Sequence, residues 1–206
     1  VGSVLFYNFP SFVENPLYLF KIWQGGMSFH GGFLGVLVAM AWYRRKLGCS
    51  FFQLTDFIAP LVPIGLAAGR LGNFINGELW GGPSTLPWAM KLSCEAFPPQ
   101  RFQDFAGALC DLPRHPSMLY EMLLEGFVLF VILWIFSSRP RPVMALSGLF
   151  LVGYGLFRSM VELIRLPDAH IGYLLDTQWL TMGMLLSLPM LLLGLIMIKI
   201  AYKREA

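Results

Sequence analysis

The chain has 206 residues, of which 56% are hydrophobic and 13% charged, with a formal net charge of +3 and a mean hydropathy of +0.63. These values exclude an ordinary water-soluble domain and indicate an integral membrane protein, for which we expect membrane lipids around the chain and no nucleic-acid partner. Several apolar runs can cross a hydrocarbon core about 30 Å thick, so the predicted fold is an all-α, polytopic transmembrane helix bundle with an extracytoplasmic loop region.

Five membrane spans are predicted in chain order, at about residues 27–43, 51–71, 118–136, 145–161 and 179–201. The second span carries Pro60 and Pro63 and the fifth carries Pro189, so we expect both to be kinked, because proline removes a backbone donor and clashes with the preceding turn. Neither a linker nor an internal repeat divides the sequence. Residues 1–206 are therefore predicted to form a single transmembrane domain.

Basic residues follow the first, third and fifth spans, as Arg44, Arg45 and Lys46, then Arg139 and Arg141, then Lys199, Lys203 and Arg204. Two crossings separate each group from the next, so all three groups fall on one side of the membrane. By the positive-inside rule this side, together with the C-terminus, is cytoplasmic. The long connection at about residues 82–116 then forms an outer loop in the extracytoplasmic compartment.

The cysteines agree with this topology. Cys94 and Cys110 both lie in the outer connection, where a disulfide can persist, whereas Cys49 follows the cytoplasmic basic group and should stay reduced. The three cysteines and three histidines do not have the spacing of a usual ligand set, so we expect no metal and no cofactor.

The first group of polar residues opens the first span at residues 28–32, where His30 is the chemically notable side chain. Imidazole titrates near neutrality, with an unperturbed pKa of about 6.5, so His30 can accept a proton. The alternative is a histidine that caps or hydrogen-bonds a helix end.

The second group ends the second span with Gly-Arg-Leu-Gly-Asn-Phe-Ile-Asn-Gly-Glu-Leu-Trp-Gly at residues 69–81. Arg70 and Asn73 follow one another at helical spacing, and charged or amide groups at membrane depth usually line a polar site enclosed by protein. The Arg70 guanidinium suits a phosphate or a carboxylate. Glu78 is interpreted as a group that orients or neutralises an arginine, with a solvated interface charge as the alternative. The alternative for the whole group is a polar helix end whose side chains only reach to the membrane–water interface.

The third group, residues 113–121, precedes and opens the third span. Ser117 is interpreted as an N-cap and Glu121 as a first-turn acid that suits the helix dipole, so helix initiation explains much of this group. Glu125 lies one turn further into the span, where a charge is costly, and we expect it to face a partner across the bundle.

The fourth group forms one stripe of the fourth span. Tyr154, Arg158, Glu162 and Arg165 lie at positions i, i+4, i+8 and i+11. Arg158 and Glu162 can also form a purely structural ion pair at i, i+4, which is the alternative to a role in binding.

Together these four groups resemble the prolipoprotein diacylglyceryl transferase family of bacteria over essentially the whole chain. The most specific match is the family signature at residues 69–78, supported by residues 29–32, by 115–117 with 119–121, and by 154–155, 157–158 and 162. Family members begin with further transmembrane helices and a His-Trp-Tyr-Gly motif, and this sequence has neither. We therefore expect an N-terminally truncated member of the family.

The resemblance implies a transferase of the bacterial inner membrane with its site toward the periplasm. It implies transfer of the diacylglyceryl group from phosphatidylglycerol to the lipobox cysteine thiol in the signal peptide of a preprolipoprotein, with release of glycerol 1-phosphate. His30 would either accept the thiol proton or donate a hydrogen bond to the phosphate, and Arg70 and Arg158 would stabilise the leaving phosphate. The expected substrate-binding residues are Arg70, Asn73, Asn76, Glu78, Gly81, Tyr154, Glu162 and Arg165.

Two other classes of function remain open from the residues alone. An anionic-solute transporter would use the same arginines in a binding site on a translocation path, but the polar groups gather at outer helix ends and the inner halves of the spans are nearly devoid of charge. A non-catalytic lipid-binding scaffold in the membrane is the second alternative.

Overall fold

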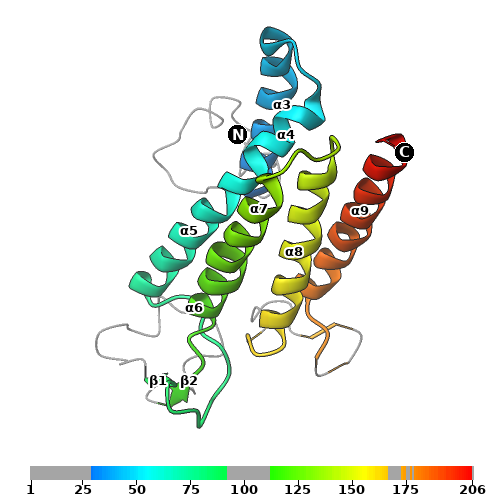
Figure 1. The fold of residues 1–206 in the computed structure, drawn as a ribbon. Coiled ribbons are helices and arrows are strands. Elements are labelled where there is room, and N and C mark those ends of the chain that lie inside the picture. The colour runs from blue at the N-terminus through cyan, green and yellow to red at the C-terminus, as the bar shows by residue number, and fades with distance from the viewer. Residues whose placement is uncertain (1–28, 92–111, 167–172, 175–176, 178, 206) are drawn as a thin grey trace, which may run out of the picture. The chain divides into compact units, whose positions relative to one another are not determined.

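The computed structural model describes residues 29–91, 112–166, 173–174, 177 and 179–205 (Figure 1). The chain divides into two compact units, Val1–Leu54 and Thr55–Ala206, which are described separately.

The first unit contains α3 (Phe29–Leu47) and the start of α4 (Phe51–Ile58). Arg44, Arg45 and Lys46 occupy the last turn of α3, where positive charge complements the helix dipole. Gly48, with φ of 65°, follows the helix in the left-handed conformation that often ends helices. A reciprocal capping box opens α4, because the Ser50 amide donates to Gln53 Oε1 over 2.8 Å and the Gln53 amide donates to Ser50 Oγ over 3.2 Å.

The described residues of the second unit contain four helical runs. The first continues from α4 through the 3₁₀ turn η3 (Ala59–Leu61) into α5 (Val62–Asn76). The second joins α6 (Ser117–Glu121), the π-helix η6 (Met122–Val128) and α7 (Leu129–Ser137). The last two are α8 (Ala145–Glu162) and α9 (Met182–Glu205). Figure 1 shows the four runs side by side, with α5 against α6 and η6, α7 against α8, and α8 against α9.

The helices lie where the apolar runs predicted them, and the all-α fold class is confirmed. Within the part of the chain that the structure describes, three runs are long and apolar enough to cross a membrane by length and composition, namely Phe51–Asn76, Ser117–Ser137 and Met182–Arg204. Helices α3 and α8 cover the other two predicted spans, and their crossing of the membrane stays a prediction. The 3₁₀ turn interrupts the second span at Pro60, as expected for proline, whereas α9 continues through Pro189.

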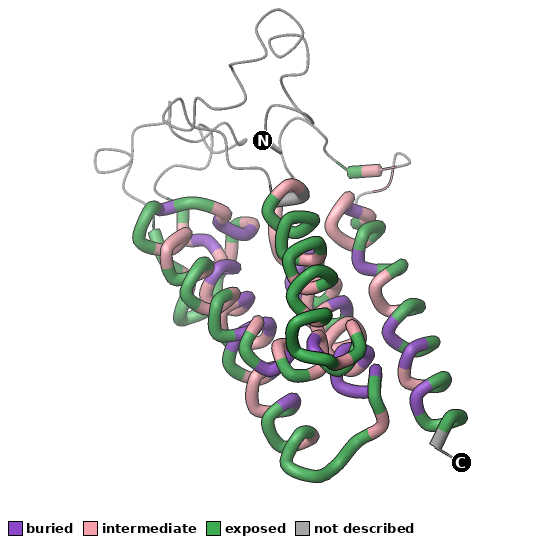
Figure 2. The backbone as a smooth tube through the Cα atoms, turned by 90° about the horizontal axis from the view of Figure 1, so that it is seen from above, coloured by how far each residue is buried: buried purple, intermediate pink, exposed green. Residues whose placement is uncertain are grey.

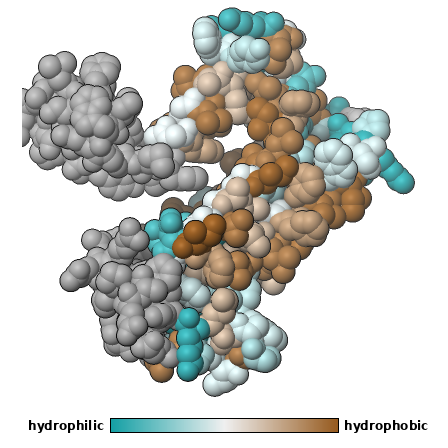
Figure 3. Space-filling view, turned by 90° about the vertical axis from the view of Figure 1, so that its left-hand side faces the viewer, coloured by the Kyte–Doolittle hydropathy of each residue, from teal (hydrophilic) through white to brown (hydrophobic). Residues whose placement is uncertain are grey.

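Apolar side chains fill the contacts between helices and also cover their outer faces. A buried cluster of Ala59, Leu129, Leu133 and Leu146 lies between η3, α7 and α8. Large apolar side chains such as Leu192 are exposed on the opposite faces. Buried and exposed residues alternate along α9 in Figure 2, and apolar surface extends over the helices in Figure 3. This pattern is typical of helices whose outer faces contact lipid.

Glycines bring α8 and α9 close together. A Cβ on Gly148 would lie 2.8 Å from the carbonyl oxygen of Gly194, and a Cβ on Gly194 would lie 2.6 Å from the carbonyl oxygen of Gly148. Because both positions lack a side chain, the two backbones touch directly, as is common between helices in membranes.

A carboxylate from the first helical run holds the start of α8. Asp56 Oδ2 accepts the Met144 amide over 2.7 Å, and Asp56 Oδ1 accepts the Ser147 amide over 2.8 Å and the Ser147 hydroxyl over 2.5 Å. Met144 precedes α8 with φ of 83°. Asp56 therefore acts as an N-cap supplied from a distant part of the sequence.

The connection after α5 begins with Gly77, whose φ of 72° ends the helix. Strand β1 (Met90–Lys91) pairs antiparallel with β2 (Pro113–Arg114), and an isolated bridge joins Gly81 to Arg165. These elements lie at the end of the unit opposite the α7–α8 loop and the C-terminus of α9 (Figure 1). The loop and that C-terminal turn carry the basic residues Arg139, Arg141, Lys203 and Arg204.

Candidate functional site

Charged side chains from three helical runs form one ion-pair cluster beside the outer connection. The cluster contains Arg70 of α5, Glu121 of α6, Glu125 of η6, Arg158 and Glu162 of α8, and Arg165 just after α8. Three arginines and three glutamates make its formal charge zero. This arrangement satisfies the requirement that buried charges be paired.

Glu121 is the centre of the cluster because it contacts all three guanidinium groups. Its Oε2 lies 2.9 Å from Arg70 Nε, and its Oε1 contacts both Arg158 Nη1 and, at 3.5 Å, Arg165 Nη1. The Glu121 side chain is completely buried. One carboxylate therefore fixes three arginines that are supplied by two different helical runs.

Two further carboxylates complete the pairing. Arg70 Nη2 donates to Glu125 Oε2 over 3.5 Å, and Arg158 Nη1 lies 3.9 Å from Glu125 Oε1. Arg158 Nη2 lies 2.8 Å from Glu162 Oε2. Arg70 thus contacts two carboxylates and Arg158 contacts three, which restrains the orientation of each planar fork.

Burial differs between the two kinds of charge. The Arg70, Arg158 and Arg165 side chains are 17%, 13% and 9% exposed, whereas those of Glu121 and Glu125 are 0% exposed. The accessible part of the cluster therefore belongs mainly to the arginine side chains, and the Glu162 side chain is only 6% exposed. A surface of this kind presents preorganised N–H donors to an anion without an uncompensated buried charge.

The cluster follows from helical spacing and helix packing. Glu121 and Glu125 are four residues apart in the second run, and Arg158 and Glu162 are four residues apart in α8, so each pair shares a side of its run. The second run packs against both α5 and α8. Its two carboxylates therefore lie between Arg70 of α5 and Arg158 of α8.

Glu162 also contacts the start of α9. A Cβ on Gly183 would lie 2.6 Å from Glu162 Cδ, so this glycine leaves room for the carboxylate. Thr181 is buried and its Oγ1 accepts the Met184 amide over 3.3 Å, as an N-cap does. A negative charge is favourable at a helix N-terminus.

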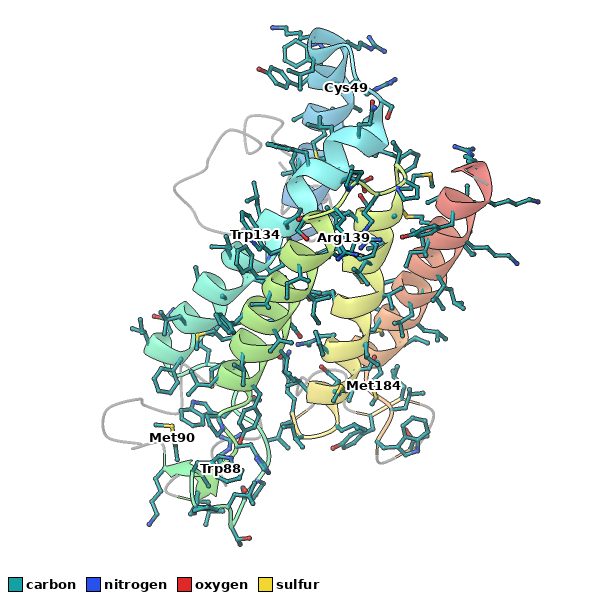
Figure 4. All side chains as sticks on the ribbon, viewed as in Figure 1. Cys49, Trp88, Met90, Trp134, Arg139 and Met184 are labelled. Atoms are coloured by element: carbon teal, nitrogen blue, oxygen red, sulfur yellow. The ribbon has the colours of Figure 1, made fainter. Side chains whose placement is uncertain are left out.

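Figure 4 labels Met184 at this end of α9 and Trp88 in the outer connection, whereas Arg139 lies toward the other end.

Gly81 holds the outer connection in place beside the cluster through hydrogen bonds of its backbone. Its amide donates to the His115 carbonyl over 2.9 Å, and its carbonyl accepts Arg114 Nε over 2.9 Å. A Cβ on Gly81 would lie 2.8 Å from both the His115 Cβ and the Ile164 carbonyl oxygen, so a larger residue does not fit. Gly81 thus has a packing role next to Arg165, and its predicted part in substrate binding stays a prediction.

The Ser117 N-cap interpretation is wrong. The N-cap position is Pro116, and Ser117 Oγ donates to the Leu79 carbonyl over 2.5 Å. The hydroxyl therefore ties the start of α6 to the chain that follows α5.

The other predicted residues lie around the cluster at different depths. Asn73 is half-buried, whereas Asn76 and Glu78 are exposed at the end of α5. Tyr154 is half-buried and its ring stacks on Phe150 with centroids 6.0 Å apart. The carboxylates on Arg70 are Glu121 and Glu125, although Glu78 was expected to orient or neutralise an arginine. The His30 side chain and both Cys94 and Cys110 lie outside the described residues.

Sequence reasoning understated the role of Glu121. It explained this residue as an acid of the first helical turn, which is wrong, because the first turn of α6 contains no acidic residue. The signal for a cluster was the repetition of glutamate four residues later within an apolar run. In the described parts of the chain, no group of histidine, cysteine, aspartate and glutamate is arranged to hold a metal ion.

Comparison with known proteins shows which family combines these features. The family model described as "Prolipoprotein diacylglyceryl transferase" matches residues 1–200. The chain belongs to this family. Members of the prolipoprotein diacylglyceryl transferase family are enzymes, so the chain is a membrane transferase of lipoprotein biosynthesis.

Relatives of the chain carry one name, phosphatidylglycerol–prolipoprotein diacylglyceryl transferase. The protein of Pseudomonas fluorescens SBW25 is 56% identical over 204 residues, which cover 99% of this chain and 71% of the relative. The protein of Serratia proteamaculans 568 is 57% identical over 218 residues, which cover 100% of this chain and 73% of the relative. This similarity favours neither a transporter nor a non-catalytic scaffold.

Proposed function

We propose that the chain transfers the diacylglyceryl group of phosphatidylglycerol to a cysteine thiol of a prolipoprotein. The observation that carries this proposal is the set of three partly accessible arginine side chains held together by buried carboxylates, together with the names of the relatives. The substrate is an anionic phosphodiester with two acyl chains, which matches a site of positive surface at the end of apolar helices.

The proposed reaction is a displacement at an sp³ carbon. The cysteine sulfur forms a bond to the glyceryl carbon that bears the phosphate, and the bond from this carbon to the phosphate oxygen breaks. The products are a thioether and glycerol 1-phosphate, and the thiol proton is transferred to a base. The phosphate gains negative charge as it leaves, so fixed positive groups stabilise the transition state more than the ground state.

Arg70 and Arg158 are proposed to bind this phosphate. They approach the buried Glu121 from α5 and α8, so both can direct remaining N–H donors toward one anion between the helices. Arginine has five donors in a fixed plane, and contact with a carboxylate uses only some of them. Arg165, held by the same carboxylate, extends the positive surface.

The remaining roles concern the thiol and the head group. His30 is proposed to accept the proton of the cysteine, since a thiolate and not a thiol is the nucleophile. Asn73, Asn76 and Tyr154 are proposed as hydrogen-bonding partners of the phosphatidylglycerol head group, with Glu78 at the rim of the site. Glu162 is proposed to act through Arg158, which it orients.

The orientation in the membrane is also part of the proposal. We place the chain in the bacterial inner membrane with the cluster toward the periplasm and the C-terminus in the cytoplasm. Support comes from the basic residues at the α7–α8 loop and the end of α9, which lie at the end of the unit opposite the outer connection (Figure 1). The acceptor cysteine is proposed to be that of the lipobox in a signal peptide.

The test is a transfer assay in membranes that contain the protein. Phosphatidylglycerol labelled in its head group is supplied with a lipobox peptide, and the expected result is thioether-linked peptide together with an equal amount of glycerol 1-phosphate. The control peptide has serine in place of the lipobox cysteine and should yield neither product. Release of glycerol 1-phosphate without dependence on the thiol would contradict the proposal.

A further inference from the structure

Helix α5 and the π-helix η6 approach one another more closely than a side chain at position 126 allows. Gly126 is buried, and a Cβ placed on it would lie 2.6 Å from Ala67 Cβ and 3.1 Å from Ala67 Cα. Two carbon atoms 2.6 Å apart overlap strongly, and neither belongs to a flexible side chain that can rotate away. The contact therefore requires glycine on η6 and a small residue on α5.

This contact lies next to the ion-pair cluster in both elements. Ala67 precedes Arg70 by three residues, which is about one helical turn, and Gly126 directly follows Glu125. The separation of the two backbones at Ala67 and Gly126 thus sets the distance that the Arg70 side chain must span. Its 2.9 Å contact with Glu121 and its 3.5 Å hydrogen bond with Glu125 both depend on that separation.

The π-helical geometry of η6 places Gly126 on the side of the helical run that faces α5. In a π-helix the backbone bonds join residues five apart, and the Leu129 amide accordingly reaches the Leu124 carbonyl. Glu121 and Gly126 are also five residues apart, so both can face α5, while Glu125 faces both Arg70 and Arg158. π-Helical segments inside longer helices are often found at functional sites.

We propose that Gly126 and Ala67 form a positioning contact that sets the geometry of Arg70 in the cluster. Neither residue touches substrate, and the contact acts through the arginine that binds the phosphate. This inference rests on the proposed function, because the effect on turnover follows only if Arg70 binds the leaving phosphate. The effect on the geometry of Arg70 does not depend on that function.

The principal test adds a methyl group to η6 at position 126 and then, in a double variant, removes the methyl group of Ala67 from α5. Gly126→Ala in the full protein should push the two elements apart and lower kcat by about 10-fold to 100-fold, since a displacement of about 1 Å at a catalytic group has effects of this size. The double variant Ala67→Gly with Gly126→Ala relieves the overlap, because the Ala67 methyl is the nearest atom. It should recover most of the lost kcat, whereas a general loss of helix stability would not be rescued in this way.

A matched control lies two residues from Ala67. A Cβ on Gly65 meets no atom of the described residues within 4 Å, so Gly65→Ala introduces the same methyl group without a clash. Its kcat should equal that of the unmodified protein.

A second measurement reads the geometry of Arg70 without catalysis. Modification of arginines by phenylglyoxal, located by mass spectrometry, should be faster at Arg70 in Gly126→Ala and return toward the original rate in the double variant. Unchanged Arg70 modification, or a loss of kcat that Ala67→Gly fails to rescue, would overturn the positioning role. Altered Arg70 modification in a protein that shows no transfer would instead uphold the contact and refute the proposed function.

Discussion

Glu121 illustrates how a single buried carboxylate organises the candidate site. It contacts three arginines and has no exposed surface. If it were removed, the guanidinium groups would be left with too few counter-charges in a poorly solvated position. Breaking a buried pair by removing one partner typically costs about 3–5 kcal/mol.

Glu121→Gln is therefore predicted to lower turnover by about 10²-fold or more, because Arg70 and Arg158 lose their shared anchor. The substitution keeps the size of the side chain, so the loss reflects charge and not volume. The measurement is diacylglyceryl transfer at equal amounts of membrane-inserted protein. The control is Arg139→Gln, which makes one charge change at an exposed residue of the opposite end. Normal turnover of Glu121→Gln would remove this carboxylate from the organisation of the site.

The two arginines themselves provide the most direct test of phosphate binding. Arg70→Ala and Arg158→Ala are each predicted to lower kcat by about 10²-fold, in line with the loss of one preorganised donor to a developing anion. Lysine at either position should restore only part of the rate, because an ammonium group lacks the planar fork that also binds the carboxylates. Arg139→Ala serves as the control. An arginine whose alanine variant transfers normally does not bind the leaving phosphate.

At the scale of elements, the start of α8 depends on a residue from another helix. Asp56 accepts the Met144 and Ser147 amides, which belong to the unpaired donors at the helix N-terminus. Because α8 carries Arg158 and Glu162 in its last turns, Asp56 helps fix the helix on which half of the cluster depends. The capping and the site lie at opposite ends of that helix.

Asp56→Ala is predicted to destabilise the protein by about 0.5–2 kcal/mol, the usual cost of losing an N-cap. Thermal unfolding in detergent, followed by circular dichroism, measures this as a lower Tm. Ser137→Ala is the control, because its exposed hydroxyl donates only to the Trp134 carbonyl within its own helix. Equal Tm values for the two variants would show that Asp56 does not stabilise α8.

At the scale of the whole molecule, the positions of charge and cysteine define an orientation that chemistry can test. Cys49 is a free thiol in the structure, and Cys94 with Cys110 belong to the outer connection. A disulfide between the latter two would stabilise the protein by about 3 kcal/mol through the entropy of the closed loop.

Thiol labelling of the denatured, unreduced protein is predicted to modify Cys49 alone, and labelling after reduction to modify all three cysteines. Mass spectrometry of the labelled peptides gives the result directly. Equal modification of Cys94, Cys110 and Cys49 before reduction would contradict the disulfide and weaken the assignment of the outer loop to an oxidising compartment.

The sequence alone determined the class of protein, the positions of the helices and the family. Hydropathy is a property of one continuous segment. An apolar run such as residues 182–204 can therefore be recognised as a membrane-spanning helix without knowledge of the helices that pack against it. The Gly-Arg-Leu-Gly-Asn motif that contains Arg70 is equally local, because its meaning lies in the order of its residues. The position of Arg158 and Glu162 on one stripe of a helix was predicted from their spacing for the same reason.

Only the tertiary structure decided which carboxylates hold Arg70. Glu78 follows Arg70 closely in sequence, but the left-handed Gly77 ends α5 before it and leaves it exposed. Glu121 is distant in sequence and reaches Arg70 because α5 packs on the second helical run. Ion pairs between helices depend on how closely the backbones approach, and that distance is set by packing contacts that no local pattern encodes.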